Sequence, residues 1–321
     1  MNRVQSILEP PQFVETVVLA FKEVQETYLP SPIGDRFRSE RSFEQFQEGL
    51  RVATDVAGSD HSILVLGCGR GFAGESTQFA VDAVQEIVSS TDWTIDTRDL
   101  TPATFGVSLD TLFTSGDFAE CRNNYDLVVT HSLVHFMPSL DAFFGLVRSL
   151  LKPSGALVVG HEPNAEFWRN QQCQLAVNEW RRARRRRGWR ERLKVIPIVR
   201  RLGRRDSVQV LADRVNQRLR DEYGFKADLT RSEISRLVDI HRPEATPGGF
   251  RIGFDGFDHE ELTRTYLPGF ALTWIKTSAH LGYASATSLS DEWSRREVEL
   301  AEAFPLAGSV LNACWRRTLL A

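Results

Sequence analysis

A short glycine-rich stretch constrains this chain more than any other feature. Residues 62–71 read Ser-Ile-Leu-Val-Leu-Gly-Cys-Gly-Arg-Gly, so an apolar run typical of a buried parallel strand stops at three alternating glycines. Glycine directly after a strand permits a tight turn and a close approach to a ligand. A helix predicted to begin near Gly74 would point its free N–H groups at the same spot. The stretch favours a cradle for a nucleotide cofactor, although an isolated glycine loop is as typical of a plain tight turn.

Length and composition place the chain among ordinary soluble globular proteins. Its 321 residues, 42% hydrophobic and 25% charged, suffice for one large domain or two small ones. No apolar run approaches the ~20 residues that span a bilayer, and residues 1–11 hold no apolar signal core, so we expect no transmembrane segment and a cytoplasmic protein. The seven histidines and the cysteines show no ligand-like spacing, so we expect no metal and no disulfide framework. The four cysteines are Cys68, Cys121, Cys173 and Cys314.

From residue 61 onward, strand-like and helix-like segments alternate. Strands are predicted at about 62–66, 93–98, 112–114, 125–131 and 156–161, and helices at about 74–89 and 139–151, the second stopped by residues 152–155. Repeated strand–helix units indicate a mostly parallel sheet, covered on both faces, that binds ligands beyond the carboxyl ends of its strands. Residues 1–60 are predicted to be helical, at about 14–24 and 42–56, and would either pack on the sheet or close over a ligand.

Three stretches beyond the glycines complete a series. They are Asp-Leu-Thr-Pro at 99–102, Gly-Asp-Phe at 116–118, and the run from 125 to 155. With the glycines, this series resembles the class I S-adenosylmethionine-dependent methyltransferases, strongly over 61–161 and more weakly over 258–319, where strands six and seven are expected at Phe270 and Val310. The resemblance implies an α/β fold with a doubly wound, mostly parallel seven-stranded sheet, and S-adenosyl-L-methionine as the cofactor. A nicotinamide-binding dehydrogenase would explain the glycines but not the downstream series.

The resemblance also implies which residues hold the cofactor. Asp99, at the end of strand two, would accept both ribose hydroxyl protons, with Asp96 as the alternative because only one of the two can point into the crevice. Asp117 would accept a proton from the adenine amino group and Phe118 would pack on the ring, unless Asp117 is only a turn residue. The expected cofactor-binding residues are Gly67, Cys68, Gly69, Gly71, Asp99, Leu100, Asp117, Phe118, His131 and Ser132.

One residue departs from the resemblance. Val65 stands where the family usually carries an acid that helps to position the methionine end of the cofactor. Valine cannot accept a hydrogen bond. Either another group, such as Glu75, takes this role, or cofactor binding is weakened or altered.

Methyl transfer is an in-line displacement on a sulfonium, for which a protein must hold the nucleophile close, exclude water and sometimes remove a proton. His161 and Glu162 follow the strand at 156–161, and His135 follows the strand at 125–131, so these three are the catalytic candidates. Histidine titrates near neutral pH and suits a general base. Against this, His131 and His135 would equally well only line or pack under the cofactor, and proximity alone can suffice.

A basic segment interrupts an otherwise acidic chain. Residues 181–205 hold 13 of the 39 Lys and Arg against one acid, which leaves 26 bases and 41 acids in the remainder. Arginine binds phosphate well, so an anionic acceptor, an acidic carrier protein, RNA and a membrane surface are all candidate partners. A solvated helix face that pairs with the acidic remainder explains the segment equally well.

Four segments follow from these observations. We expect an N-terminal helical segment at 1–60, a cofactor-binding α/β core at 61–162, a helical cap insertion at 163–250, and the C-terminal part of the core at 251–321. The insertion is too long for a plain connection, and in the resembling family such segments cover the acceptor.

The sequence therefore predicts an enzyme that methylates an enclosed small molecule, as in secondary-metabolite biosynthesis. One alternative is a methyltransferase of RNA or of a carrier-bound substrate that uses the basic segment. Nucleic acid is the less favoured acceptor, because residues 130–133 lack an Asn-Pro-Pro-Tyr type sequence. Another alternative is a protein that binds the cofactor without transferring its methyl group. A homodimer is compatible with the sequence.

Overall fold

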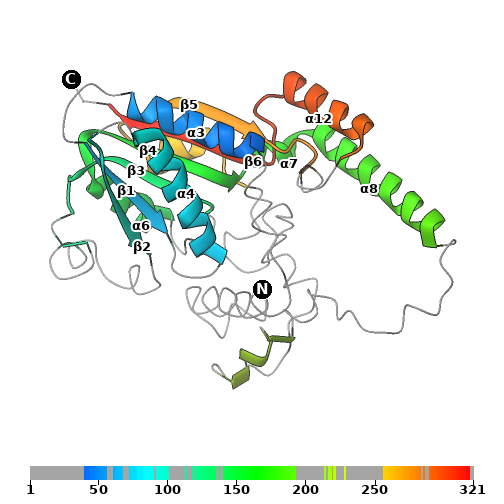
Figure 1. The fold of residues 1–321 in the computed structure, drawn as a ribbon, viewed down its shortest axis with the longest axis horizontal. Coiled ribbons are helices and arrows are strands. Elements are labelled where there is room, and N and C mark those ends of the chain that lie inside the picture. The colour runs from blue at the N-terminus through cyan, green and yellow to red at the C-terminus, as the bar shows by residue number, and fades with distance from the viewer. Residues whose placement is uncertain are drawn as a thin grey trace.

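The computed structural model describes somewhat more than half of the chain. The described residues are 40–55, 61–67, 72–89, 92–100, 113, 118–119, 121–134, 137, 140–192, 213–214, 216–218, 220–221, 228, 256–282, 285 and 289–318; residues 40–42, 72–76 and 184–192 contribute their backbone only. Within them lies one six-stranded sheet with helices on both faces (Figure 1).

The strand order places a reversal beside the first strand. The sheet runs β2-β1-β3-β4-β6-β5. The strands are β1 (Ser62–Gly67), β2 (Thr94–Asp99), β3 (Tyr125–His131), β4 (Leu151–Pro163), β5 (Phe270–Ser278) and β6 (Val310–Arg317). The first four strands pair in parallel, whereas β6 lies between β4 and β5 and pairs antiparallel with both. Because β2 and β3 lie on opposite sides of β1, the carboxyl ends of β1 and β3 flank the point where open α/β sheets bind ligands.

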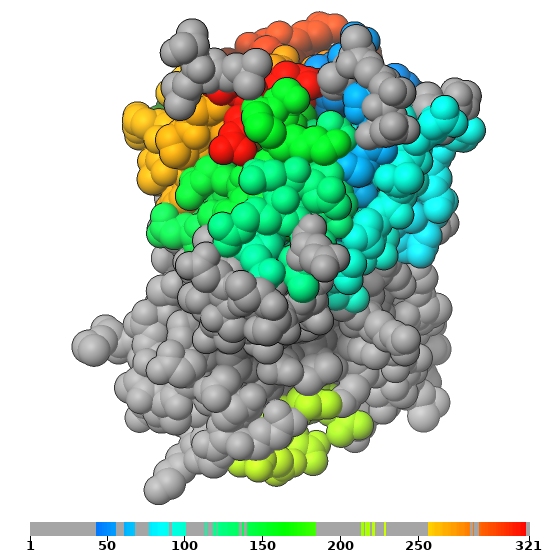
Figure 2. All heavy atoms as spheres, turned by 90° about the vertical axis from the view of Figure 1, so that its left-hand side faces the viewer, coloured from blue at the N-terminus to red at the C-terminus, as the bar shows by residue number. Residues whose placement is uncertain are grey.

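Each face of the sheet has its own hydrophobic cluster. Helices α3 (Glu40–Thr54) and α4 (Phe72–Val88) cover one face, where Phe46 and Ala80 pack on Ile63 and Val65 of β1. The other face carries helix α6 (Leu140–Leu150), α11 (His259–Glu261) and the π-helical turn η4 (Leu262–Tyr266). The hydrophobic cluster on this face includes Leu64 of β1. Successive strand residues therefore contribute to opposite faces, as the alternation of a strand requires. In the space-filling view of Figure 2, the orange segment that begins at 256 lies against the green of 140–163.

A third cluster lies beyond the end of β4. It is formed by α7 (Ala165–Arg169), the first half of α8 (Gln171–Arg192) and α12 (Asp291–Ala303). Cys173, Val177 and Trp180 recur at helical spacing along α8 and pack with Leu300 of α12. The second half of α8 continues away from the sheet (Figure 1).

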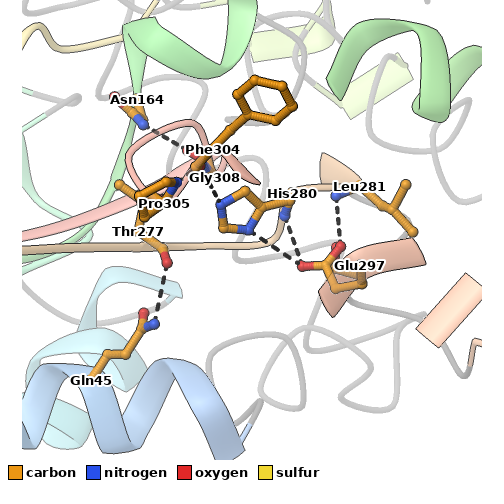
Figure 3. A network of polar contacts seen from close by, with 10 residues as sticks. Gln45, Asn164, Thr277, His280, Leu281, Glu297, Phe304, Pro305 and Gly308 are labelled. Carbon is orange, nitrogen blue, oxygen red and sulfur yellow. Dashed lines mark hydrogen bonds and ion pairs between the residues drawn. The ribbon is translucent and has the colours of Figure 1, made fainter. Parts of the chain in front are cut away.

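A polar network fixes the connection from β5 to β6 (Figure 3). Glu297 accepts hydrogen bonds from the backbone N–H groups of His280 and Leu281, at 2.8 and 2.7 Å, and from the Ser285 hydroxyl at 2.9 Å. The His280 ring lies 3.1 Å from the Phe304 carbonyl oxygen. Burial alone would raise the pKa of Glu297, but the hydrogen bonds from His280 and Ser285 outweigh it, and the pKa is lowered.

The predicted α/β fold is confirmed, with three differences. The described sheet has six strands in place of seven, and Phe113, from the predicted strand at 112–114, is helical. Two of the five strand pairings are antiparallel, so the sheet is mixed. Strand β4 begins at Leu151, directly after α6, so residues 152–155 belong to the strand and do not form a separate helix stop. The predicted helix at 14–24 lies outside the described residues, and no helix in the described part of the chain could cross a bilayer.

Candidate active site

The ends of β1 and β2 meet where the sequence predicts the cofactor. Gly67 and Asp99 are partners in the parallel register, and the Leu100 N–H donates to the Gly67 carbonyl at 2.6 Å. A Cβ at Gly67 would overlap Thr77 of α4 and lie 2.9 Å from Oδ1 of Asp99. A larger residue would have to displace the Thr77 and Asp99 side chains, so the position favours glycine.

The two candidate carboxylates of β2 have different surroundings. Asp96 accepts a hydrogen bond from the Tyr125 hydroxyl at 2.7 Å and pairs with Arg98 at 3.2 Å. Burial, together with the hydrogen bond to Asp96, raises the pKa of Tyr125 well above its ordinary range, so this phenol stays protonated. Asp99 is exposed at the strand end, beside Gly67. The geometry therefore favours Asp99 over Asp96 as the ribose ligand.

Several predicted cofactor residues form a wall or lie outside the described part. Leu100 and Phe118, 3% and 1% exposed, share a hydrophobic cluster with Leu133 and Val134 from the segment after β3. Val65 is fully buried in the cluster beneath α3 and α4, where it has no polar role. The remaining predictions, Cys68, Gly69, Gly71, Asp117, His135 and the Glu75 side chain, lie outside the described residues.

Two histidines stack at the ends of β3 and β4. The rings of His131 and His161 lie 5.3 Å apart, centroid to centroid, at an interplanar angle of 22°. His131 also contacts Phe79 of α4 and Phe46 of α3, at 4.5 and 5.0 Å. A Cβ at Gly160 would overlap the Phe46 ring. The two imidazoles are therefore packed within an aromatic enclosure beneath α3 and α4.

The backbone at these two strand ends adopts an uncommon conformation. Ser132 and His161 have φ values of 51° and 56°, in the left-handed region that non-glycine residues seldom enter. The Ser132 N–H donates to the Gly160 carbonyl at 2.7 Å, and the His161 N–H donates to Oδ1 of Asn312 at 3.0 Å. Left-handed residues that the surrounding structure holds in place tend to gather at ligand sites, so this pair supports a site here.

Glu162 is directed at the segment after β3. It is fully buried, and its Oε1 accepts hydrogen bonds from the backbone N–H groups of Leu133 and Val134, both at 2.7 Å. Its expected catalytic role, like that of His161, stays a prediction.

Sequence reasoning missed Asn312. It is fully buried on β6, and it reaches His161 across 151 residues of sequence. The available signal was a lone amide within the apolar run of β6. Within the described residues, the Asn312 amide nitrogen and the hydroxyls of Thr130 and Ser132 have no hydrogen-bond partner, so they are available to a ligand or to water.

The chain leaves the sheet after β4 and returns to the same point. The Phe257 N–H donates to the Pro163 carbonyl at 2.7 Å, and the Ala165 N–H donates to the Phe257 carbonyl at 3.1 Å. A Cβ at Gly256, whose φ is +82°, would overlap the backbone of Asn164. Residues 165–256 are therefore an insertion whose two ends lie side by side at the carboxyl end of β4.

No group of three or more metal-ligating side chains occurs in the part of the chain that the structure describes.

No protein-family model and no curated protein matches the chain. Among solved structures, it is similar to a candidate sarcosine dimethylglycine methyltransferase from Galdieria sulphuraria, with 14% identity, 88% of each chain covered and a TM-score of 0.35. The plantazolicin methyltransferase BpumL, in complex with SAH, gives 11% identity, 96% of this chain, 97% of that chain and a TM-score of 0.33. Phosphoethanolamine N-methyltransferase 2 from Haemonchus contortus, in complex with S-adenosyl-L-methionine, gives 14% identity over 48% of this chain and 35% of that chain, with a TM-score of 0.25. At these identities and TM-scores, the similarity assigns no cofactor and no reaction to this chain.

Proposed function

We propose that this protein is a class I S-adenosylmethionine-dependent methyltransferase that acts on a small-molecule acceptor. The observation that carries the proposal is the pairing of Gly67 with Asp99 beside the reversal in strand order. A glycine at the end of β1 and an exposed carboxylate that can accept two ribose hydroxyl protons then lie at the usual ligand position of an open α/β sheet.

The strand order supports a cofactor with a single nucleoside. A dinucleotide fold joins two parallel halves, so that strands on both sides of the crevice run in one direction. Here β4 is followed in the sheet by the antiparallel strand β6. In the described sheet, the half beyond β1 thus has only two neighbouring parallel strands, β3 and β4, before the direction changes, which favours S-adenosyl-L-methionine over a nicotinamide dinucleotide.

The residues present fit this cofactor, because Asp99 is exposed beside Gly67 and the buried hydroxyls of Thr130 and Ser132 at the end of β3 have no hydrogen-bond partner. Asp99 would hold the ribose, and Leu100 and Phe118 would give the base an apolar wall. The bound cofactor would supply an electrophilic methyl group on its sulfonium. His161, at the end of β4 and stacked on His131, is the proposed base for an acceptor that has to lose a proton.

The insertion supports an enclosed acceptor. Its two ends meet where Asn164 pairs with Phe257, two residues after Glu162. We propose that residues 163–250 form a cap over the acceptor, which would exclude water and hold the nucleophile near the methyl group. Secondary-metabolite biosynthesis and a cytoplasmic location belong to the same proposal.

Calorimetric titration tests the cofactor assignment. Wild-type protein should bind S-adenosyl-L-methionine and S-adenosylhomocysteine but not NADH. Asp99→Asn removes one charged acceptor and should weaken both affinities about tenfold. Asp96→Asn makes the same change on the same strand and can still accept the Tyr125 hydrogen bond, so its affinities should stay at the wild-type value. NADH binding in place of S-adenosyl-L-methionine would overturn the assignment.

Transfer of a labelled methyl group tests the acceptor class. The protein is incubated with methyl-labelled cofactor and, separately, with the small-molecule, RNA and protein fractions of a cognate extract. Label in the small-molecule fraction supports the proposal. Label in RNA, or in a carrier protein, would favour the alternative that the basic segment suggests. Cofactor binding without any transfer would point to a protein that keeps the cofactor for another purpose.

A further inference from the structure

A bulge in β4 changes the direction of Glu162. Val159 pairs with Ala313, whereas Glu162 pairs with Leu311, so three steps along β4 match two steps along β6. Strand alternation without the bulge would put Glu162 on the face of α3 and α4. The extra residue moves it to the opposite face, where Val159, Leu311 and Ala313 share the cluster of α6.

On that face Glu162 meets the segment that joins β3 to α6. Its Oε1 accepts the N–H groups of Leu133 and Val134, both at 2.7 Å, and its side chain is fully buried. A fully buried carboxylate is costly unless hydrogen bonds satisfy it, and these two backbone donors supply that compensation. Leu133 and Val134 belong to the same cluster as Leu100 and Phe118.

Asn312 holds the bulge in place. It lies between Leu311, the partner of Glu162, and Ala313, the partner of Val159, and so opposite Gly160 and His161. Its Oδ1 accepts the His161 N–H at 3.0 Å. The hydrogen bond replaces the ladder partner that the bulge removes. It also fixes the left-handed φ of His161.

We propose that Glu162 is a positioning residue: held in its direction by the bulge at Gly160–His161 and by Asn312, it clamps residues 132–134 against the proposed cofactor wall. Glu162 then acts through the backbone that it holds, and it does not take a proton from the acceptor. The inference rests on the proposed function, because the wall matters only if a cofactor lies against it.

Two substitutions separate the clamp from a proton acceptor. Glu162→Gln keeps an Oε1 that can accept both N–H groups, whereas Glu162→Met keeps a similar volume and removes the acceptor. Glu297 offers the matched control, because it also accepts two adjacent backbone N–H groups but holds the β5–β6 connection. Glu297→Met repeats the loss of an acceptor away from the cofactor wall.

The measurements are hydrogen exchange at the Leu133 and Val134 amides and the affinity for S-adenosylhomocysteine. Glu162→Met should speed exchange at both amides about tenfold and weaken affinity about tenfold. Glu162→Gln should keep both near the wild-type values. Glu297→Met should lower the melting temperature with unchanged affinity. If Glu162→Met does not fold, Asn312→Ala gives the second route, because loss of the bulge bond should also speed exchange at these amides.

The outcomes separate the two proposals. If the wild type binds neither S-adenosyl-L-methionine nor S-adenosylhomocysteine, the proposed function is wrong and the clamp loses its role. If the wild type binds the cofactor but Glu162→Met leaves amide exchange and affinity unchanged, only the positioning role is wrong. The same holds for Asn312→Ala where Glu162→Met does not fold. Equal loss of affinity in Glu162→Met and Glu297→Met would show a general effect of destabilisation and would also overturn it.

Discussion

Gly67 ends strand β1 and is in close contact with a side chain of helix α4 and with the carboxylate of Asp99. Its Cβ position is occupied on one side by Thr77 and on the other by Asp99. Gly269 gives a contrast, because its φ is +78° but no atom lies within 4 Å of its Cβ position. One glycine is therefore required by contact and the other by backbone conformation.

Gly67→Ala should lower the free energy of unfolding by about 1–3 kcal/mol, because Thr77 and Asp99 have to move. Asp99 would leave the ribose position, so affinity for S-adenosylhomocysteine should fall about tenfold. Gly269→Ala should cost about 1 kcal/mol through φ alone and leave the affinity unchanged. Urea unfolding and calorimetry measure both quantities. Equal effects of the two substitutions on affinity would refute the contact argument.

Val65 shows how one residue changes the expectation drawn from a resemblance. The family's usual acid is absent, and the valine is fully buried in the cluster beneath α3 and α4. Val65→Asp should therefore not improve a cofactor site. It should destabilise the fold by about 3 kcal/mol or more, because it buries a carboxylate among apolar side chains. Val65→Ile, which stays apolar, is the control. Tighter cofactor binding by a stable Val65→Asp protein would contradict this placement.

Among the helices and strands, the sequence patterns predicted those elements that depend on residues close together in the chain. The apolar runs of β1 and β3 and the one-sided helix α6 lie where their periodicity placed them, and β6 lies where the resemblance placed the last strand. The bulge in β4 was out of reach, because it depends on the register with β6, about 150 residues away. The direction of Glu162 and the role of Asn312 depend on that bulge, so a strand-by-strand reading could name Glu162 but could not tell which way it points.

The choice between Asp96 and Asp99 has the same origin. Strand alternation separates two faces but does not say which carboxylate finds a partner. The Tyr125 hydroxyl, from β3, binds Asp96, which leaves Asp99 as the proposed ribose ligand. Conversely, the glycine series predicted the end of β1 correctly, because the tight turn and the strand that precedes it are both local.

The connection from β5 to β6 should give the fold a dependence on acid. Since the pKa of Glu297 is lowered from its ordinary value of 4.5, its contribution to stability is present above that value and is lost as the pH falls through the folded-state pKa. At neutral pH, Glu297→Gln should cost about 1–2 kcal/mol. The difference from wild type should shrink as the pH falls below 4.5 and Glu297 takes up a proton in the folded state. Urea unfolding at a series of pH values measures it, and a difference that does not change with pH would contradict the charge-based account.

At the scale of the whole molecule, the insertion is closed at its base. Its ends pair at Asn164 and Phe257, and its first part packs through Val177 and Trp180 onto α12. An insertion whose ends are adjacent can be shortened with little effect on the sheet that carries it. Recognition of the cofactor, on β1 and β2, and enclosure of the acceptor are therefore separable in the proposed function.

Replacement of residues 184–255 by a Gly/Ser linker tests that separation. From Gln171 to Ala183 the helix α8 spans about 18 Å, at about 1.5 Å per residue. A flexible linker of about 15 residues has an r.m.s. end-to-end distance of about 20 Å, so it can join Ala183 to Gly256. The described sheet and the three clusters described above are kept, because their residues lie outside the replaced stretch.

The shortened protein should bind S-adenosylhomocysteine within about threefold of the full chain, a difference of less than 1 kcal/mol. Methyl transfer to the acceptor fraction should fall by at least about a hundredfold, because positioning and exclusion of water are lost while the cofactor site remains. A variant in which a Gly/Ser linker replaces only residues 241–250 is the control for the effect of inserting a linker. Transfer that persists after loss of 184–255 would mean that the acceptor is held elsewhere on the sheet. Loss of cofactor binding by a shortened protein that keeps its circular-dichroism spectrum would mean that the insertion belongs to the cofactor site.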